Sequence, residues 1–132
     1  MKLEHIGIAV KSLENSNQLF KDLFNREHYK IEGVESEHVN TSFFQVGESK
    51  IELLEATDPQ SPIAKFIEKN GEGIHHLAFE VKDIDAELKR LSDLGYRLIH
   101  EQPKDGADNK RIAFLHPKST NGVLVELCQE KA

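Results

Sequence analysis

The chain opens with the strand-like segment LEHIGIAV at residues 3–10, which returns in related form as IHHLAFEV at residues 74–81. Both segments alternate β-branched or aromatic side chains with other residues, which is the pattern of a half-buried strand. A second pair of segments repeats in the same order, IEL at residues 51–53 and VEL at residues 125–127. Two related modules therefore follow one another along this chain.

Each module has the same succession of expected elements. The first strand is followed by a helix with an apolar stripe, and Ser12 and Asp83 stand where a side chain would cap the start of each helix. Three further strand-like runs complete each module, so the expected order is βαβββ twice. These runs lie near residues 28–34, 41–46 and 50–55 in the first module, and near residues 96–101, 111–116 and 122–128 in the second.

We expect a single domain. A length of 132 residues, with 38% apolar and 30% charged residues, suits one compact unit with a real core. Turn-forming residues are concentrated between the modules, which marks a connector and not a boundary between independent domains. The predicted layout is one domain over residues 1–132, with modules at residues 1–56 and 73–129 and a linker at residues 57–72.

Charge, hydropathy and cysteine content exclude several classes of partner. The net charge of −6 opposes phosphate binding, so we expect no nucleic-acid partner. No apolar run approaches the roughly 18 residues of a membrane span, and no signal-like segment opens the chain, so we expect no membrane partner. The single cysteine, Cys128, allows no intramolecular disulfide and predicts a cytoplasmic location.

The repeat places two metal-binding residue types at equivalent positions in both modules. His5 corresponds to His76, and Glu52 corresponds to Glu126. Strand alternation puts each of them on the face away from the bulky apolar residues, beside small residues such as Gly7. A lone strand histidine is more often structural than a ligand, but two duplicated His and Glu sets predict one divalent metal site with two imidazoles and two carboxylates. Such a site suits Co²⁺, Mn²⁺, Zn²⁺ or Ni²⁺.

Several segments carry a resemblance to known proteins, namely HIGIAV at residues 5–10, GIHHLA at residues 73–78, and HPKS at residues 116–119 running into GVLVEL at residues 122–127. They resemble the vicinal oxygen chelate superfamily, which includes glyoxalase I and extradiol dioxygenases. Within it, the chain is similar to the methylmalonyl-CoA epimerase family along nearly its whole length. The resemblance implies an α+β fold, in which two tandem βαβββ modules form a curved, partly open mixed β-sheet barrel with helices outside. It also implies one divalent metal ion per chain and a homodimer.

The same resemblance implies an activity and a small-molecule acyl-CoA substrate. The family epimerises methylmalonyl-CoA with the help of a metal, by removing and returning the proton on the carbon α to the thioester. On this basis His5, Glu52, His76 and Glu126 are the expected metal ligands. Glu126 is also the expected catalytic base, and Lys118 and Ser119 are expected to bind substrate.

Inversion requires a second acid/base, and here the chain departs from part of the family. Some members carry a glutamate where our alignment places Ser42, and a serine hydroxyl is a poor base at neutral pH. Two other functions therefore stay open. One is a lactoylglutathione lyase-type isomerase, against which the short loops and the HPKS segment argue. The other is a non-catalytic small-molecule binding protein of the same fold, against which the complete set of four ligands argues.

Overall fold

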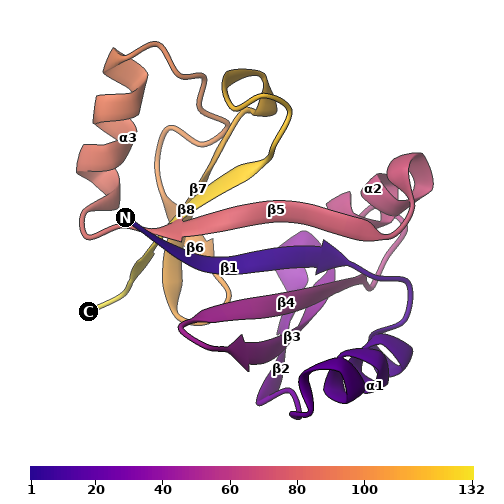
Figure 1. Cartoon of the computed structure of the whole chain (residues 1–132). Helices are drawn as coiled ribbons and strands as arrows, with labels where there is room; N and C mark the ends of the chain where they lie inside the picture. Colours follow the sequence, from indigo (N-terminus) through magenta and orange to yellow (C-terminus); the bar gives the residue numbers. More distant parts are fainter. The chain divides into compact units, whose positions relative to one another are not determined.

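The computed structural model describes residues 1–132, and these residues form two compact units. We call residues 5–75 the first unit and residues 1–4 together with 76–132 the second unit. Each unit contains one of the repeated modules, and the observed order of elements is βαβββ in both (Figure 1). The α+β fold with tandem βαβββ modules is therefore confirmed.

The first unit is a four-stranded sheet with two helices. Its strand order is β2-β3-β4-β1, with β1 parallel to β4 and the other neighbours antiparallel. The strands are β1 (Lys2–Ala9, of which residues 5–9 belong here), β2 (Lys30–Val34), β3 (Val39–Val46) and β4 (Ser49–Ala56). The helices are α1 (Leu13–Phe24) and α2 (Pro62–Asn70), with a short 3-10 turn, η1, at Glu35–Glu37.

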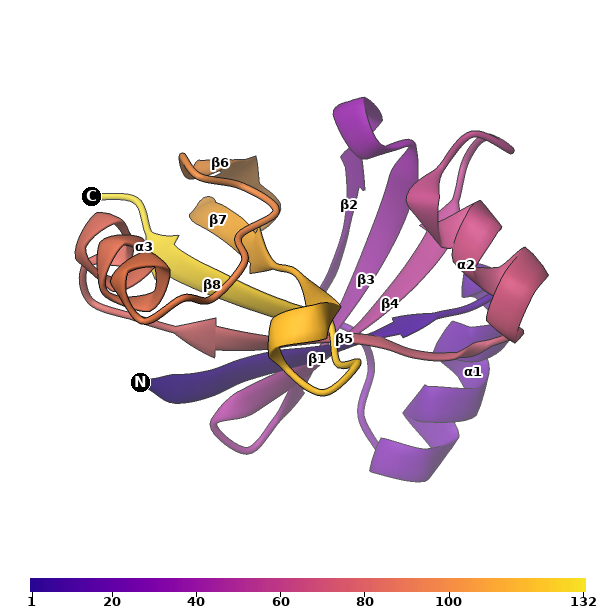
Figure 2. The ribbon, with the colours of Figure 1, turned by 90° about the horizontal axis from the view of Figure 1, so that it is seen from above.

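The second unit repeats this arrangement with one helix. Its strand order is β5-β8-β7-β6, and again the outer neighbours are antiparallel while β5 and β8 run parallel. Helix α3 lies against β8 (Figure 2). The elements are β5 (Gly73–Glu80, of which residues 76–80 belong here), α3 (Ile84–Asp93), β6 (Lys104–Gly106), β7 (Lys110–Leu115), η2 (Pro117–Ser119) and β8 (Val125–Glu130).

Both repeated helices begin where the sequence indicates. The Ser12 side chain accepts a hydrogen bond from the backbone N–H of Asn15, and the Asp83 side chain accepts one from Ala86. These contacts satisfy backbone donors that the first turn of a helix leaves without a partner. The two caps fix the start of α1 and α3 at equivalent distances from the preceding strands.

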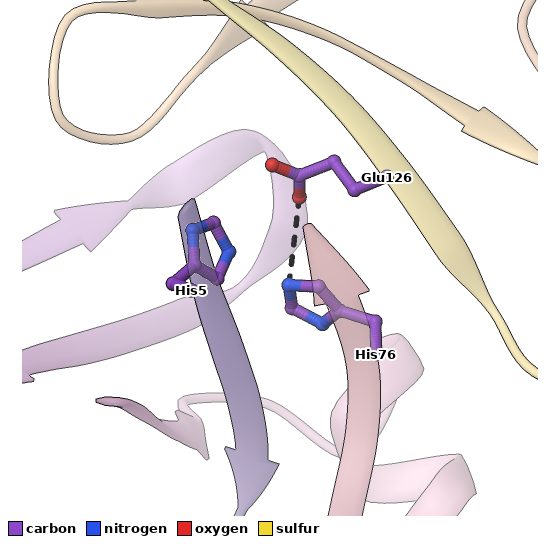
Figure 3. A group of neighbouring side chains, drawn as sticks. All are labelled: His5, His76 and Glu126. Carbon is purple, nitrogen blue, oxygen red and sulfur yellow. Dashed lines mark ion pairs between the residues drawn. The ribbon is translucent and has the colours of Figure 1, made fainter. Parts of the chain in front are cut away.

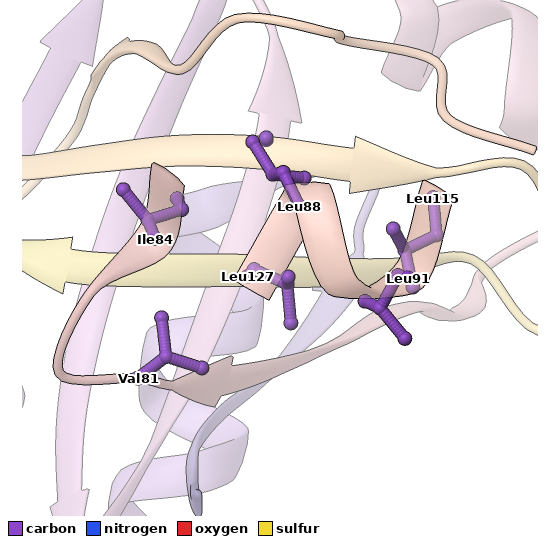
Figure 4. Packing of buried hydrophobic residues seen from close by; sticks show 7 residues of the cluster. Val81, Ile84, Leu88, Leu91, Leu115 and Leu127 are labelled. Carbon is purple, nitrogen blue, oxygen red and sulfur yellow. The ribbon is translucent and has the colours of Figure 1, made fainter. Parts of the chain in front are cut away.

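The apolar faces of the sheets pack against the helices, as strand alternation predicts. In the second unit, Leu88 and Leu91 of α3 pack against Leu115 and Leu127 of the sheet (Figure 4). In the first unit, the α1 face of the sheet is filled by an equivalent cluster that includes Leu53. Burial of such side chains contributes roughly 1.5–3 kcal/mol each, so these clusters hold the helices in place.

The opposite face of the first sheet is covered in part by α2. Ala9 and Leu54 lie on the face that also carries Glu52, and they pack against Ile63 of the helix. Ala9 is fully buried in this packed core. The α2 helix therefore covers the part of this face around Ala9 and Leu54.

One expected strand of the second module is wrong. The chain near residues 96–101 makes only an isolated bridge, between Leu98 and Leu115, and the strand next to β7 is β6 at Lys104–Gly106. Asp108 and Asn109 adopt left-handed backbone conformations, with φ of 60° and 57°. Such a pair makes the tight turn that folds β6 back onto β7. β6 and β7 therefore form a β-hairpin.

Candidate functional site

The first unit holds one of the two predicted His and Glu pairs. In the parallel ladder of β1 and β4, Glu52 stands opposite Gly7, two residues beyond His5 on the same face. The Nδ1 atom of His5 lies 2.9 Å from Oε2 of Glu52. Both side chains are nearly buried, with 6% and 7% of their surface exposed. The absence of a side chain at Gly7 leaves room for the carboxylate to lean back toward the imidazole.

The second unit holds the other pair in an equivalent frame. In the parallel ladder of β5 and β8, Glu126 stands opposite Ala78, two residues beyond His76 on the same face. Figure 3 shows the His76 ring and the Glu126 carboxylate facing each other, and Nε2 lies 3.5 Å from Oε1. The side chains have the same low exposures of 6% and 7%. A small residue again stands opposite the glutamate.

The spacing within each pair fits two ligands of one divalent ion. Ligand atoms about 2.1 Å from a metal would lie about 3.0 Å apart at a right angle and about 3.4 Å apart at a tetrahedral angle. The observed separations of 2.9 Å and 3.5 Å match these values. Imidazole nitrogen and carboxylate oxygen also form a donor set that first-row divalent ions accept. Each unit therefore carries a buried His and Glu pair that suits metal coordination.

The structure corrects the placement of Ser42. In the antiparallel ladder of β3 and β4, Ser42 stands opposite Leu53, whereas Phe43 stands opposite Glu52. Ser42 therefore faces α1, where its hydroxyl donates a hydrogen bond of 2.5 Å to Oδ1 of Asn17. The β3 residues that share the face of Glu52 are Thr41 and Phe43. Ser42 is a buried structural residue and does not stand on the ligand face.

Two charged residues on the Glu52 face were missed by sequence reasoning. In the ladder of β2 and β3, Lys30 stands opposite Phe43 and Glu32 stands opposite Thr41. The Lys30 ammonium lies 4.8 Å from the centre of the Phe43 ring and 3.3 Å from Oε1 of Glu32. The alternation of KIEGV at residues 30–34 shows that Lys30 and Glu32 share a face, but the register with β3 is needed to say which face.

The expected substrate-binding residues lie in η2 of the second unit. The Lys118 side chain is exposed, and its backbone N–H donates to Nδ1 of His116. The Ser119 hydroxyl oxygen accepts a hydrogen bond of 2.8 Å from the backbone N–H of Arg97. This contact anchors the short helical turn to the segment after α3. The role of Lys118 and Ser119 toward substrate remains a prediction.

Two further titratable residues, Cys128 and His75, are largely buried. Cys128 is fully buried on the Glu126 side of β8, and burial, followed by the charges of Glu126 and Glu4, raises the pKa of its thiol far above the usual range. A neutral buried thiol is inert, so Cys128 is not a nucleophile. The ring of His75 packs edge-on against Phe66 of α2 at 5.0 Å, and burial lowers its pKa. Burial keeps the Cys128 thiol neutral and favours the neutral form of His75.

The chain matches known proteins over nearly its whole length. The glyoxalase/bleomycin resistance protein/dioxygenase superfamily is matched over residues 4–114. Methylmalonyl-CoA epimerase of Dictyostelium discoideum is 42% identical over 96% of this chain and 76% of its own length. Ethylmalonyl-CoA/methylmalonyl-CoA epimerase of Cereibacter sphaeroides is 41% identical over 97% of both chains.

A solved structure agrees with these matches. A variant of Streptomyces coelicolor methylmalonyl-CoA epimerase, in complex with 2-nitronate-propionyl-CoA, is 35% identical and superimposes with a TM-score of 0.95. The match covers 100% of this chain and 96% of that one. None of the helices is both long and apolar enough to span a membrane. The chain belongs to the methylmalonyl-CoA epimerase family of the glyoxalase/bleomycin resistance protein/dioxygenase superfamily.

Proposed function

We propose that this protein epimerises methylmalonyl-CoA by moving the proton on the carbon between the thioester and the free carboxylate. The observation that carries the proposal is near full-length identity of 41–42% to two such epimerases, in a chain that keeps both buried His and Glu pairs. The Cereibacter sphaeroides relative also bears the name of an ethylmalonyl-CoA epimerase. Ethylmalonyl-CoA is therefore a second substrate to test on this chain.

We further propose that the two pairs serve one divalent metal ion, with His5, Glu52, His76 and Glu126 as its ligands. The duplicated frame supports this proposal, because each module presents the same two donor atoms from the same strand positions. When bound, the metal would stabilise the negative charge that develops on the thioester oxygen as the proton leaves. Co²⁺, Mn²⁺, Zn²⁺ and Ni²⁺ all suit this donor set.

Glu126 is the proposed base. Its carboxylate is nearly buried, and Oε1 lies 3.5 Å from Nε2 of His76. An oriented carboxylate next to the substrate carbon accepts the α-proton without having to give up a full shell of water. Glu52 has the same burial and the same type of partner. We assign Glu52 to metal binding alone, by resemblance to the family.

Two other parts of the proposal follow from the resemblance, and a third follows from the cysteine content. Lys118 and Ser119 contact the acyl-CoA, and η2 holds them beside each other. The protein assembles as a homodimer, which light scattering of the purified protein would test. The proposed cytoplasmic location rests on the lone cysteine, Cys128, which suits a reducing compartment.

The decisive experiment follows both stereoisomers of methylmalonyl-CoA in deuterated water, with metal content measured on the same protein. We expect inversion accompanied by deuterium incorporation at the α-carbon, and loss of both after a chelator removes the metal. The hemithioacetal of methylglyoxal and glutathione serves as the competing substrate. Turnover of that compound without inversion of methylmalonyl-CoA would favour a lactoylglutathione lyase-type isomerase. Binding of acyl-CoA with no exchange at all would favour a non-catalytic binding protein.

A further inference from the structure

The proposed reaction needs a second proton-transfer group, because inversion removes a proton from one face of the carbon and returns it to the other. Glu126 can serve one face only. Ser42 is turned toward α1 and hydrogen-bonded to Asn17. Thr41, its neighbour on the Glu52 face, offers an alcohol that is a poor acid and a poor base near pH 7. Neither hydroxyl of β3 is therefore suited to this role, whereas a carboxylate on the same face would be.

The ladder of β2 and β3 brings a carboxylate to that face. Directly opposed residues of an antiparallel pair point to the same side of the sheet. Glu32 is opposite Thr41, and Thr41 is opposite Leu54, which shares its face with Glu52. Glu32 therefore projects from the same side of the first sheet as the metal-binding pair of that unit.

The neighbouring residue on this face orients Glu32. Lys30 is opposite Phe43, which in turn is opposite Glu52, so these three residues form one row across the sheet. The Lys30 ammonium is held over the Phe43 ring at 4.8 Å, and it lies 3.3 Å from the Glu32 carboxylate. The carboxylate is thus drawn along the sheet toward the row that contains Glu52. It also keeps contact with water, since 36% of the Glu32 side chain is exposed.

The distance between Glu32 and Glu52 determines how far a bound acyl group must extend to meet both carboxylates. The backbone positions of Glu32 and Glu52 are two strands apart, at about 4.8 Å per strand, and two residues apart along the strands, at about 3.4 Å per residue. Because these two directions are perpendicular, the positions lie about 12 Å apart. An extended side chain at Glu32 covers part of this distance, whereas the Glu52 carboxylate leans away from Glu32 toward His5. Glu32 therefore meets the α-carbon only if the bound acyl group lies across the sheet between the two carboxylates.

We propose that Glu32 is the second acid/base of the epimerisation, acting on the face of the α-carbon opposite to Glu126. This inference rests on the proposed function. In one direction the Glu126 carboxylate takes the α-proton, and the electron pair of the C–H bond moves into the thioester carbonyl. The carboxylic acid form of Glu32 then gives its proton to the other face of the carbon, as the electron pair returns to form the new C–H bond. The reverse reaction restores both groups to their starting states.

If Glu32 had a purely structural role, its removal would affect stability or association and not proton transfer. Strand β2 stands at the outer end of the first unit's strand order, and charged side chains on such a strand often serve only to prevent edge-to-edge association. A half-exposed ion pair of this kind contributes about 0–1 kcal/mol to stability. If this were its only role, removal of the Glu32 charge would leave the fate of the α-proton unchanged.

The test separates exchange from inversion in the metal-loaded Glu32→Gln variant. Each pure stereoisomer is incubated in deuterated water, and the deuterium content and configuration are measured over time. We expect inversion to fall by ~10²–10⁴-fold, the usual effect of a lost proton-transfer group. The isomer whose proton faces Glu126 should still incorporate deuterium with retention, while the other isomer should not exchange. In Glu126→Gln, the isomer whose proton faces Glu32 should incorporate deuterium with retention, and the isomer whose proton faces Glu126 should not exchange.

Control variants separate this role from damage to the fold. Glu35→Gln removes an exposed carboxylate of η1 close by in the same unit, and it should invert substrate at the wild-type rate. Glu32→Asp keeps a carboxylate and should recover part of the inversion. Wild-type inversion in Glu32→Gln, or equal loss of exchange from both isomers, would overturn the assignment. If the wild-type protein inverts neither methylmalonyl-CoA isomer, the proposed function itself fails.

Discussion

Replacement of Glu126 by glutamine separates proton transfer from metal binding. The glutamine keeps an oxygen ligand and almost the same shape in a position where 7% of the side chain is exposed, so repacking is minimal. The amide cannot accept the α-proton. A lost general base lowers the rate by ~10²–10⁴-fold. At about 1.36 kcal/mol per factor of ten, this corresponds to a barrier higher by about 3–5.5 kcal/mol.

Glu52→Gln is the matched control, because Glu52 has the same 7% exposure and the same kind of histidine partner in the first unit. We expect this variant to keep much more activity at equal metal occupancy. The assay measures inversion, deuterium incorporation and metal content on the same samples. Full activity of metal-loaded Glu126→Gln would refute the base assignment. Equal losses in both variants would show that the two carboxylates act alike and that Glu126 has no special role.

Three other predictions concern metal content, pH dependence and stability. His5→Ala and His76→Ala should each lose most of the bound metal by elemental analysis, and wild-type content in both would contradict the ligand assignment. Burial lowers the pKa of His75, so on acidification the unfolded chain binds a proton at this residue before the native protein does. The free energy of unfolding should therefore fall as pH drops below about 6.5. His75→Phe should weaken this pH dependence in denaturant titrations. Leu53→Ala should cost about 3–5 kcal/mol of unfolding free energy because the side chain is fully buried, whereas Leu23→Ala, 68% exposed, should cost under about 0.5 kcal/mol.

The sequence was sufficient for features that depend on local pattern or on the repeat. The caps at Ser12 and Asp83 follow from residue type and position relative to the helix. The two His and Glu pairs follow from equivalence between the modules, since a repeated frame must place equivalent residues alike. The position of Gly7 on the same strand face as His5 follows from strand alternation.

Features that depend on strand register could not be obtained in this way. A shift of one residue turns a strand side chain to the other face of its sheet, and no local signal distinguishes Thr41 from Ser42. The same uncertainty concealed the position of Glu32, which becomes meaningful only through its pairing with β3. The packing of α2 against Ala9 could not be predicted either, because α2 comes from the linker, for which the repeat provides no counterpart.

The presence of a complete His and Glu pair inside each unit has an evolutionary consequence. A gene encoding a single module would need to specify only one histidine and one glutamate, and two identical copies of its product would together supply four donor atoms. Fusion of two such genes would release each copy from the requirement to be identical. One glutamate could then specialise in proton transfer while its counterpart remained an anchor, and the connector between the copies could become the helix α2 that now covers one sheet alone.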